Sequence, residues 1–339
     1  MTPHYFFSSV TRLSDLWKEP FETVPLRRQH WASGDFVVGR VSGQRNRLYR
    51  CETKTGRMAD VVVGDLIVGA LGERAATLEA AGDWRAVDES LQLDALTGAG
   101  LLGKTTSISP LLPELVRLDY LGHVARKGQK INMMDCVHQV PPKQFDQPVV
   151  LLIGTSMSAG KTSSGQVIIR ALNYLGMKVA AAKLTGAARY RDILTFRDAG
   201  AHPVIDFVDA GLPSTVCTEQ RFRAAMELML SQLAAADPDA LVVEAGASPL
   251  EPYNGAIVIE YLGPLAVFTV LCASDPYSVL GVQTAYGEHL RADLVSGPAA
   301  NTTAAISLVK KLTGLDALNL LDRHSYPELT NRLKTAFSL

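Results

Sequence analysis

Residues 149–162 read Val-Val-Leu-Leu-Ile-Gly-Thr-Ser-Met-Ser-Ala-Gly-Lys-Thr. The apolar run at the start of this stretch is typical of a buried strand, and a loop of small residues follows it. After Thr162, apolar residues recur at helical spacing from Val167 to Leu175. A strand, a loop that ends in Gly-Lys-Thr and a helix are the context that a phosphate-binding P-loop needs. The sequence therefore predicts such a loop over residues 154–163.

Two side chains of this loop are expected to act together with its backbone. In such loops the backbone N–H groups cradle phosphate oxygens, and the N-terminus of the following helix adds positive potential. Lys161 is expected to reach the outer phosphates of a nucleotide, and the Thr162 hydroxyl to ligate Mg²⁺. A later predicted strand ends at the same edge of the sheet, where ligands of parallel sheets bind. The expected nucleotide-binding residues are Gly154, Thr155, Ser156, Met157, Ser158, Ala159, Gly160, Lys161, Thr162, Ser163, Ser296, Gly297 and Asn301.

The chain contains a second Gly-Lys-Thr motif, at residues 98–105, which read Gly-Ala-Gly-Leu-Leu-Gly-Lys-Thr. Its outer glycines are separated by four residues, as in the usual P-loop pattern, whereas five residues separate Gly154 from Gly160. However, Pro110 and Pro113 follow closely, so no helix can continue after this motif. The sequence therefore favours a glycine-rich surface turn here. The alternative is a loop that reaches over the active site of the other domain.

Composition indicates a packed protein without nucleic-acid or membrane partners. The chain has 339 residues, of which 47% are apolar and 20% charged, enough for two domains with packed cores. The net charge of -1 and the lack of a long basic run argue against nucleic acid as the main partner. No apolar run reaches the length of about 18–20 residues that spans a bilayer, and the N-terminus lacks a signal-peptide pattern. We therefore expect a cytoplasmic protein.

Three regions differ in character along the chain. Residues 1–32 are mixed and aromatic, and are expected to form an arm that packs on another domain or subunit. Residues 33–140 contain short β-type runs with tight turns, which predict a small β-barrel or sandwich, with helical periodicity at 74–80 and 91–96. Residues 145–339 alternate apolar strands with helices, which predicts a parallel sheet wrapped by helices. The expected fold class is α/β, a parallel-sheet P-loop NTPase domain preceded by a smaller β-rich domain.

The same patterns give the bounds of the individual elements. Besides the strand of the P-loop, strands are expected at residues 35–41, 47–52, 60–71, 178–182, 240–244, 266–272, 293–296 and 318–321. Residues 204–208 are expected to form a short strand or a turn. In the C-terminal region, helices are expected at residues 192–198, 221–234, 302–312 and 327–337.

Charged side chains follow the neighbouring strands of the predicted parallel sheet. Lys183 comes after the strand 178–182 and is expected to neutralise charge on a transferring phosphoryl group. Glu244 ends the strand 240–244, where an acid beside a P-loop is expected to hold Mg²⁺ or to position water. Asp192 is a further Mg²⁺ candidate, although neighbouring arginines make a solvated helix face an equal alternative.

The loops that leave these strands supply candidates for contact with a substrate. Asp206 lies near the end of the strand 204–208 and is expected to hold substrate or metal, or else to cap a loop. Residues 249–255 leave the acidic strand toward the acceptor side of the pocket. The candidate substrate-binding residues are Thr185, Asp206, Ser248, Glu251, Tyr253 and Asn254.

With these motifs in place, the C-terminal half resembles the P-loop family of dethiobiotin synthetase and cobyrinic acid a,c-diamide synthase. The likeness rests on the five-residue gap between Gly154 and Gly160, on Lys183 to Gly186 after the next strand, and on the element Val-Glu-Ala-Gly-Ala at 243–247. Residues 204–211 are also similar to the P-loop half of a family that includes D-glutamate N-acetyltransferases. The N-terminal half resembles no family that we can name.

The first resemblance implies an ATP- and Mg²⁺-dependent ligase. Such an enzyme activates a carboxylate or carbamate by γ-phosphoryl transfer, and an amine then captures the acyl phosphate. By this likeness Lys161 and Lys183 stabilise the phosphoryl group, and Thr162, Glu244 and Asp192 hold Mg²⁺. The resemblance also implies a small carboxylated metabolite as substrate and a homodimer as the assembly. Two residues depart from the family pattern: Ser156 stands where an acid is frequent, and Ala245 where a glycine follows the acid.

Two other functions stay open at this point. One is an acetyl-CoA-dependent N-acyltransferase, in which the P-loop holds the phosphates of coenzyme A. The other is a nucleotide-dependent regulatory or accessory NTPase, whose β-rich domain contacts a partner.

Overall fold

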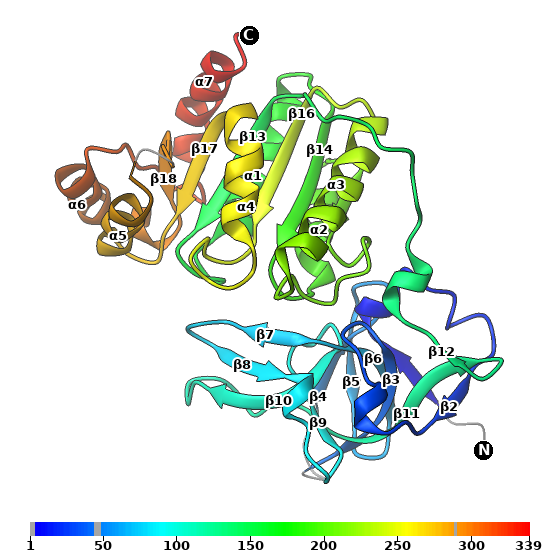
Figure 1. The fold of residues 1–339 in the computed structure, drawn as a ribbon. Coiled ribbons are helices and arrows are strands. Elements are labelled where there is room, and N and C mark those ends of the chain that lie inside the picture. Colours follow the sequence, from blue (N-terminus) through cyan, green and yellow to red (C-terminus); the bar gives the residue numbers. More distant parts are fainter. Residues whose placement is uncertain (1–3, 44–48, 288–289) are drawn as a thin grey trace. The chain divides into compact units, whose positions relative to one another are not determined.

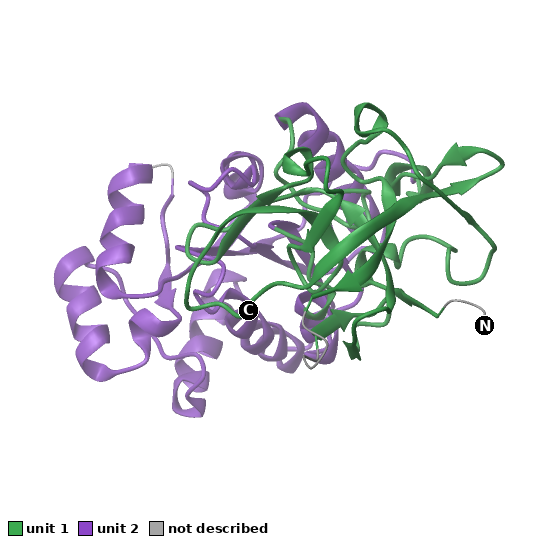
Figure 2. Cartoon of the chain, turned by 90° about the horizontal axis from the view of Figure 1, so that it is seen from below, with its two compact units in different colours: residues 1–139, 187–191, 207–218 green, residues 140–186, 192–206, 219–339 purple. Residues whose placement is uncertain are grey.

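The computed structural model describes residues 4–43, 49–287 and 290–339, and the chain divides into two compact units (Figure 1, Figure 2). Unit 1 comprises residues 1–139 together with two later segments, 187–191 and 207–218. Unit 2 comprises residues 140–186, 192–206 and 219–339. The boundary between the units is therefore not a single point in the sequence, because two short segments from the second half of the chain belong to unit 1.

Unit 1 is built on a β-sheet that closes on itself. Its strands pair in the order β1-β6-β3-β11-β9-β10-β8-β7, and β10 pairs in addition with β6. The path β6-β3-β11-β9-β10 is therefore a closed barrel, which confirms the expected β-rich region. The strands are β1 (Tyr5–Phe7), β2 (Glu22–Val24), β3 (Phe36–Ser42), β4 (Tyr49–Glu52), β5 (Met58–Val61), β6 (Leu66–Leu71), β7 (Glu73–Ala75), β8 (Ala80–Asp83), β9 (Gln92–Ala95), β10 (Leu101–Ile108), β11 (Arg117–Arg126) and β12 (Gln129–Lys130).

Two strands come from the predicted N-terminal arm, since β1 pairs with β6 and β2 pairs with β11. The pair β4 and β5 forms a separate two-stranded sheet. Of the strand expected at 47–52, Arg47 and Leu48 lie outside the described residues.

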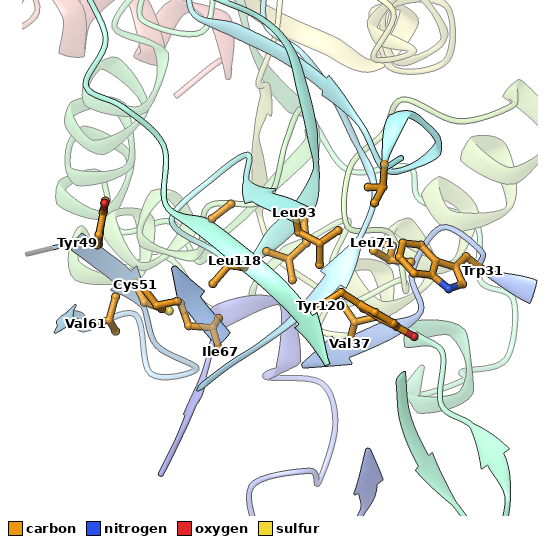
Figure 3. Packing of buried hydrophobic residues seen from close by; sticks show 14 residues of the cluster. Trp31, Val37, Tyr49, Cys51, Val61, Ile67, Leu71, Leu93, Leu118 and Tyr120 are labelled. Carbon is orange, nitrogen blue, oxygen red and sulfur yellow. The ribbon is translucent and has the colours of Figure 1, made fainter. Parts of the chain in front are cut away.

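The core of unit 1 is a cluster of buried hydrophobic side chains from several strands and loops (Figure 3). Leu118 of β11 pairs in register with Leu93 of β9, and both side chains are fully buried. Trp31 lies against Tyr120, with 4.6 Å between the ring centroids. Burying a leucine of this kind stabilises the fold by roughly 1.5–3 kcal/mol, so the closed barrel gives unit 1 a core of its own.

A chain of polar side chains also crosses the buried part of unit 1. Asp35 and His123 are both fully buried, and His123 Nε2 lies 3.3 Å from Asp35 Oδ2. The other ring nitrogen of His123 is 2.6 Å from the Tyr120 hydroxyl. Lys130 Nζ donates to Asp35 Oδ2 at 2.6 Å, and Asn132 Nδ2 donates to Asp35 Oδ1 at 2.8 Å. Asp35 is thus a buried carboxylate whose charge is compensated, as burial of an ion requires.

We expect Asp35→Asn to destabilise the protein by about 2 kcal/mol at neutral pH. Burial alone would raise the pKa of Asp35, but the nearby His123 ring and the hydrogen bonds from Lys130 and Asn132 outweigh it and hold this pKa below its ordinary value of 3.8. A carboxyl with a lowered pKa stabilises the folded state above its ordinary pKa, and this stability is lost as the pH falls through the lower, folded value. Denaturant unfolding from pH 7 to pH 3 should therefore show the two proteins converging in stability at low pH. A constant difference over this range would contradict the assignment.

Three predictions for unit 1 are wrong. Residues 74–80 contain the last two residues of β7 and the first of β8, and residues 91–96 contain all of β9, so neither stretch is a helix. Short apolar runs fit the helix and strand periods about equally, and here the pairing of β9 with β10 and β11 decides for strands. Residues 98–105 are not a surface turn, because the motif runs into β10 and its two leucines are fully buried. The same strand confirms that this Gly-Lys-Thr motif does not open a helix.

Unit 2 is a parallel sheet with helices between its strands, which confirms the expected fold class. Its strands lie in the order β15-β14-β16-β13-β17-β18, and every pairing is parallel. The elements are β13 (Val149–Gly154), α1 (Lys161–Tyr174), β14 (Val179–Thr185), α2 (Tyr190–Asp198), β15 (Val204–Asp206), α3 (Glu219–Ala235), β16 (Ala240–Ala245), α4 (Gly255–Leu262), β17 (Ala266–Cys272), α5 (Pro276–Tyr286), β18 (Leu294–Ser296), α6 (Thr303–Thr313) and α7 (Tyr326–Ala336). The first two residues of α2 belong to unit 1.

One of the two central strands of unit 2 is β13, which pairs with β16 on one side and with β17 on the other. Because all strands run the same way, their carboxyl ends meet at one edge, where ligands of such sheets bind. The strand expected at 318–321 is wrong: this stretch is irregular, and only Ala317 bridges to Val295. The helices α4 and α5 were not predicted. In the described part of the chain, no helix combines the length and hydropathy that crossing a bilayer requires.

Candidate phosphate-binding site in unit 2

The loop between β13 and α1 has the geometry of a P-loop. The strand β13 ends at Gly154, and α1 begins at Lys161. A side chain at Gly154 would place its Cβ 2.5 Å from Lys161 Nζ, so glycine is required for the lysine to fold back along the loop. Gly160 precedes the helix with φ +91°, a left-handed conformation that favours glycine. The first N–H groups of α1 have no acceptor within the helix, so they are donors for an anion.

Lys161 is the buried cation of this loop. Its side chain is 1% exposed, and Nζ donates a hydrogen bond to the carbonyl of Ser156 at 2.6 Å. Burial lowers the pKa of Lys161, and the positive charge of Lys183 adds to this effect, while the charge of Glu244 opposes it. A buried ammonium that donates to a neutral carbonyl is costly to the fold. A bound phosphate would supply compensating negative charge.

Thr162 and Glu244 form a pair next to this lysine. Glu244 lies on β16 in register with Leu152 of β13, and Thr162 is the second residue of α1. The Thr162 hydroxyl donates to Glu244 Oε2 at 2.8 Å. Burial and the charge of Asp192 raise the pKa of Glu244, against the opposing charges of Lys183 and Lys161. A hydroxyl and a carboxylate fit Mg²⁺, which takes one or two protein ligands and completes its shell with phosphates and water.

A second buried lysine lies at the end of the neighbouring strand. Lys183 of β14 pairs in register with Glu244 on one side and with Asp206 on the other. Its Nζ donates to Asp192 Oδ2 at 2.5 Å and lies 4.0 Å from Glu244 Oε1. Burial alone would lower the pKa of Lys183, but the charges of Asp192 and Glu244 outweigh it and raise this pKa. Lys183 is therefore held protonated at the carboxyl edge of the sheet.

The structure therefore brings together the three expected catalytic residues, Lys161, Lys183 and Glu244. Asp192 contacts Lys183. The role of Asp192 as a magnesium ligand stays a prediction. Among the outer nucleotide-binding candidates, Gly297 lies against the P-loop, since its Cβ would fall 2.2 Å from the carbonyl of Ala159. The Ser296 hydroxyl donates to the carbonyl of Leu318 at 3.1 Å, and Asn301 is exposed.

The expected substrate residues differ in their surroundings. Asp206 is fully buried beside Lys183. Glu251 Oε2 accepts a hydrogen bond from the backbone N–H of Ser248 at 2.8 Å, so these two residues shape the loop before α4. Tyr253 is fully buried, and Asn254 has φ +63° at the start of α4. Contact of these residues with a substrate stays a prediction.

The hydroxyl of Thr185 is buried and has no hydrogen-bond partner among the described residues. An unmet buried hydroxyl costs about 1–3 kcal/mol, whereas a bound ligand that contacts it would remove that cost. We expect Thr185→Val to stabilise the unliganded protein by about 1 kcal/mol and to weaken binding of the site's ligand about fivefold to tenfold. Thermal unfolding and a binding titration measure the two effects.

Thr97→Val is the matched control, because its hydroxyl in unit 1 is also buried and also lacks a partner in the described structure. This control should gain stability with unchanged ligand affinity. Equal affinity of wild type and Thr185→Val would show that Thr185 does not face the ligand.

The sequence gives no structural role for Gly246 and no sign of a contact between Thr155 and Ser274. Gly246 lies beneath Lys183, because a Cβ there would come within 2.1 Å of the carbonyl of Thr185 and 2.6 Å of Lys183 Cε. The backbone N–H of Ser274, after β17, donates to the Thr155 hydroxyl at 3.1 Å. The start of α5 beside this contact carries a sequence signal, since Asp275-Pro276 is typical of a helix start and Asp275 caps α5.

Several solved structures resemble this chain distantly. A DUF1611 family protein from Anabaena variabilis is 16% identical, with a TM-score of 0.39, over 60% of this chain and 61% of that one. HypB from Helicobacter pylori in complex with nickel is 15% identical, with a TM-score of 0.39, over 57% of this chain and 88% of that one. FlhF complexed with GMPPNP and Mg²⁺ is 16% identical, with a TM-score of 0.31, over 52% of this chain and 66% of that one. No family profile and no curated protein matches the sequence.

The match thus spans less than two thirds of the DUF1611 family protein, and likeness at this level assigns no function. What identifies the site is its own geometry. A parallel strand, a glycine-bounded loop and a helix that starts with a buried lysine and a threonine make unit 2 a P-loop α/β domain.

Proposed function

We propose that the protein binds ATP with Mg²⁺ at the P-loop of unit 2 and transfers the γ-phosphoryl group to a carboxylate oxygen of a small metabolite. The observation that carries this proposal is the convergence of Lys161, the Thr162–Glu244 pair and Lys183 at the ends of three adjacent strands. Phosphoryl transfer depends on such positioning and on charge stabilisation rather than on a protein nucleophile.

Each group has a distinct part in this reaction. The carboxylate oxygen of the acceptor attacks the γ-phosphorus, the bond from γ-phosphorus to the β–γ bridging oxygen breaks, and ADP leaves with that electron pair. Lys161 neutralises the outer phosphates, and Lys183 stabilises charge on the group in transfer. Thr162 and Glu244 would hold Mg²⁺, which supplies further charge neutralisation.

The acceptor class and the second half-reaction are supported by the sequence likeness to dethiobiotin synthetase. In a ligase of this type an amine attacks the acyl phosphate, a carbon–nitrogen bond forms, and inorganic phosphate leaves. The same likeness supports a homodimer. Lys183 agrees with a carboxylated acceptor, since a protonated lysine beside the phosphates favours an anionic nucleophile.

A regulatory NTPase is the second candidate. It is supported by two segments that follow strands of unit 2 but belong to unit 1. Residues 187–191 follow β14 and residues 207–218 follow β15, yet both segments belong to unit 1. Segments that leave nucleotide-site strands and join another unit are suited to report the nucleotide state to that unit.

Turnover assays separate these functions. The purified protein is mixed with ATP–Mg²⁺ and a panel of carboxylated metabolites, with and without an amine donor, and ADP release is followed. A ligase releases ADP only with its acceptor present, whereas a regulator hydrolyses ATP slowly whatever is added. Consumption of acetyl-coenzyme A without nucleotide hydrolysis would overturn both proposals and favour acyl transfer.

A further inference from the structure

Unit 1 contains a buried carboxylate that the proposed reaction does not use. Glu52 of β4 is 1% exposed. Its Oε2 accepts a hydrogen bond from the backbone N–H of Tyr190 at 2.9 Å, and its Oε1 accepts one from the N–H of Arg191 at 3.0 Å. The hydroxyl of Ser9 donates a further hydrogen bond to Oε2. All four residues belong to unit 1.

The position of these N–H groups explains why a charge is buried here. Tyr190 and Arg191 are the first two residues of α2, and the first N–H groups of a helix have no acceptor within it. The residue before the helix is Arg189, whose side chain has only donors and so cannot act as the usual cap. Glu52 supplies the missing cap from a point 138 residues away in the sequence. A negative charge at a helix N-terminus is favourable in itself.

A second contact fixes the same turn of chain within unit 1. The guanidinium of Arg12 lies over the ring of Tyr190, with 4.4 Å from Cζ to the ring centroid. Its Nη2 also lies 3.0 Å from Asp209 Oδ1, in the segment that follows β15. The start of α2 is thus held by a carboxylate on its backbone and by a cation on its first side chain.

The next residue along the chain links this cap to the phosphate site. Asp192 follows Arg191 directly in the first turn of α2, and its carboxylate is the hydrogen-bond partner of Lys183 Nζ. We propose that Glu52 is a positioning residue, which fixes the first turn of α2 so that Asp192 holds the ammonium of Lys183 in place for phosphoryl transfer. This inference rests on the proposed function, in which Lys183 acts on the γ-phosphoryl group.

The proposal predicts an effect on turnover rather than on nucleotide binding. The ammonium of Lys161 is held within the P-loop itself, by the carbonyl of Ser156, so affinity for ATP–Mg²⁺ should change less than about twofold in Glu52→Gln. The side-chain amide of this variant can accept from one N–H but presents a donor to the other. Because small misplacement of a catalytic group costs up to about 100-fold, kcat should fall roughly tenfold to 100-fold with KM unchanged.

A double-variant cycle tests whether Glu52 acts through Asp192. If it does, adding Glu52→Gln to Asp192→Asn should lower kcat no further, whereas independent roles would give additive losses. Asp35→Asn is the matched control, since Asp35 is an equally buried carboxylate of unit 1 whose partners in the described structure lie outside α2. It should leave kcat unchanged at a temperature where both variants are folded. Additive losses, or an equal loss of kcat in Asp35→Asn, would overturn the proposal.

Two readouts remain informative if no turnover is found. Hydrogen exchange of the amides of residues 190–192 should accelerate in Glu52→Gln but not in Asp35→Asn. Acetylation of Lys183 by an amine-reactive ester, followed by mass spectrometry, should speed up in the same variant. Unchanged values for both would overturn the positioning role, while changed values without any ATP turnover in wild type would overturn only the proposed function. If Glu52→Gln does not fold, Ser9→Ala removes one hydrogen bond to the carboxylate and should shift both readouts in the same direction.

Discussion

Lys161→Met is expected to abolish nucleotide binding without loss of stability in the unliganded protein. Lys161 is fully buried, and its ammonium has the carbonyl of Ser156 as its hydrogen-bond partner, so removing the charge removes a desolvation cost. A bound triphosphate would lose a buried, charge-assisted contact worth about 3–5 kcal/mol, which is roughly 100-fold or more in affinity. Titration with a fluorescent ATP analogue and thermal unfolding measure the two effects.

The second Gly-Lys-Thr motif supplies a matched control for this variant. Lys104 has the same neighbours in sequence as Lys161 but lies in β10 of the barrel. Lys104→Met should bind nucleotide as wild type does. A Lys161→Met protein with wild-type affinity, or one that no longer folds, would contradict the role assigned to Lys161.

The difference in stability between the wild type and Lys161→Met should depend on pH, because the pKa of Lys161 differs between the folded and unfolded chain. Burial lowers this pKa below its ordinary value of 10.5, so between the two values the unfolded chain binds more protons than the folded one. Stability of the wild type therefore gains from this group as the pH rises toward 10.5. Lys161→Met lacks that gain, so the advantage of the variant should shrink at alkaline pH.

Glu244→Gln is expected to remove the magnesium dependence of the reaction. Glu244 accepts the hydrogen bond of Thr162 and is the carboxylate at the expected metal position. Losing this ligand should lower turnover roughly 100-fold to 1000-fold, while binding of ATP without Mg²⁺ stays within about twofold of wild type. Asp239→Asn is the control, because Asp239 comes directly before the same strand, β16. Equal Mg²⁺ dependence in wild type and Glu244→Gln would show that the metal binds elsewhere.

Acid should weaken Mg²⁺ binding at a higher pH than for an ordinary carboxylate. Burial and Asp192 raise the pKa of Glu244 above its ordinary value of 4.5. Only the ionised carboxylate attracts a cation, so Mg²⁺ affinity of the wild type should fall as the pH drops through the raised value. In Glu244→Gln, Mg²⁺ titrations should lack this step.

The site was predictable where its residues follow one another along the chain. The P-loop and Glu244 each depend on a strand and the residues directly after it, and both patterns are local. The elements of unit 1 were less predictable, because residues 91–96 become a strand only through closure of the barrel. The Gly-Lys-Thr motif at 98–105 shows the same limit, since its context and not its spacing determines its structure.

Interactions between distant parts of the chain were not visible in the sequence. Glu52 caps residues that follow it by 138 positions, and nothing near either end of this contact indicates the other. The contact between the Asp192 carboxylate and Lys183 was not expected from the sequence, because it forms only where β14 and the first turn of α2 come together. The role of Asp192 on Mg²⁺ stays a prediction. The inclusion of 187–191 and 207–218 in unit 1 likewise depends on contacts that no local pattern encodes.

Calorimetry of the purified protein with ATP–Mg²⁺ tests the central claim most directly, repeated with ADP–Mg²⁺, acetyl-coenzyme A and the Lys161→Met and Lys104→Met variants. A nucleotide site at residues 154–163 predicts ATP binding that Mg²⁺ strengthens, that Lys104→Met retains and that Lys161→Met loses. Binding of acetyl-coenzyme A alone, or ATP binding that is indifferent to Lys161, would contradict it.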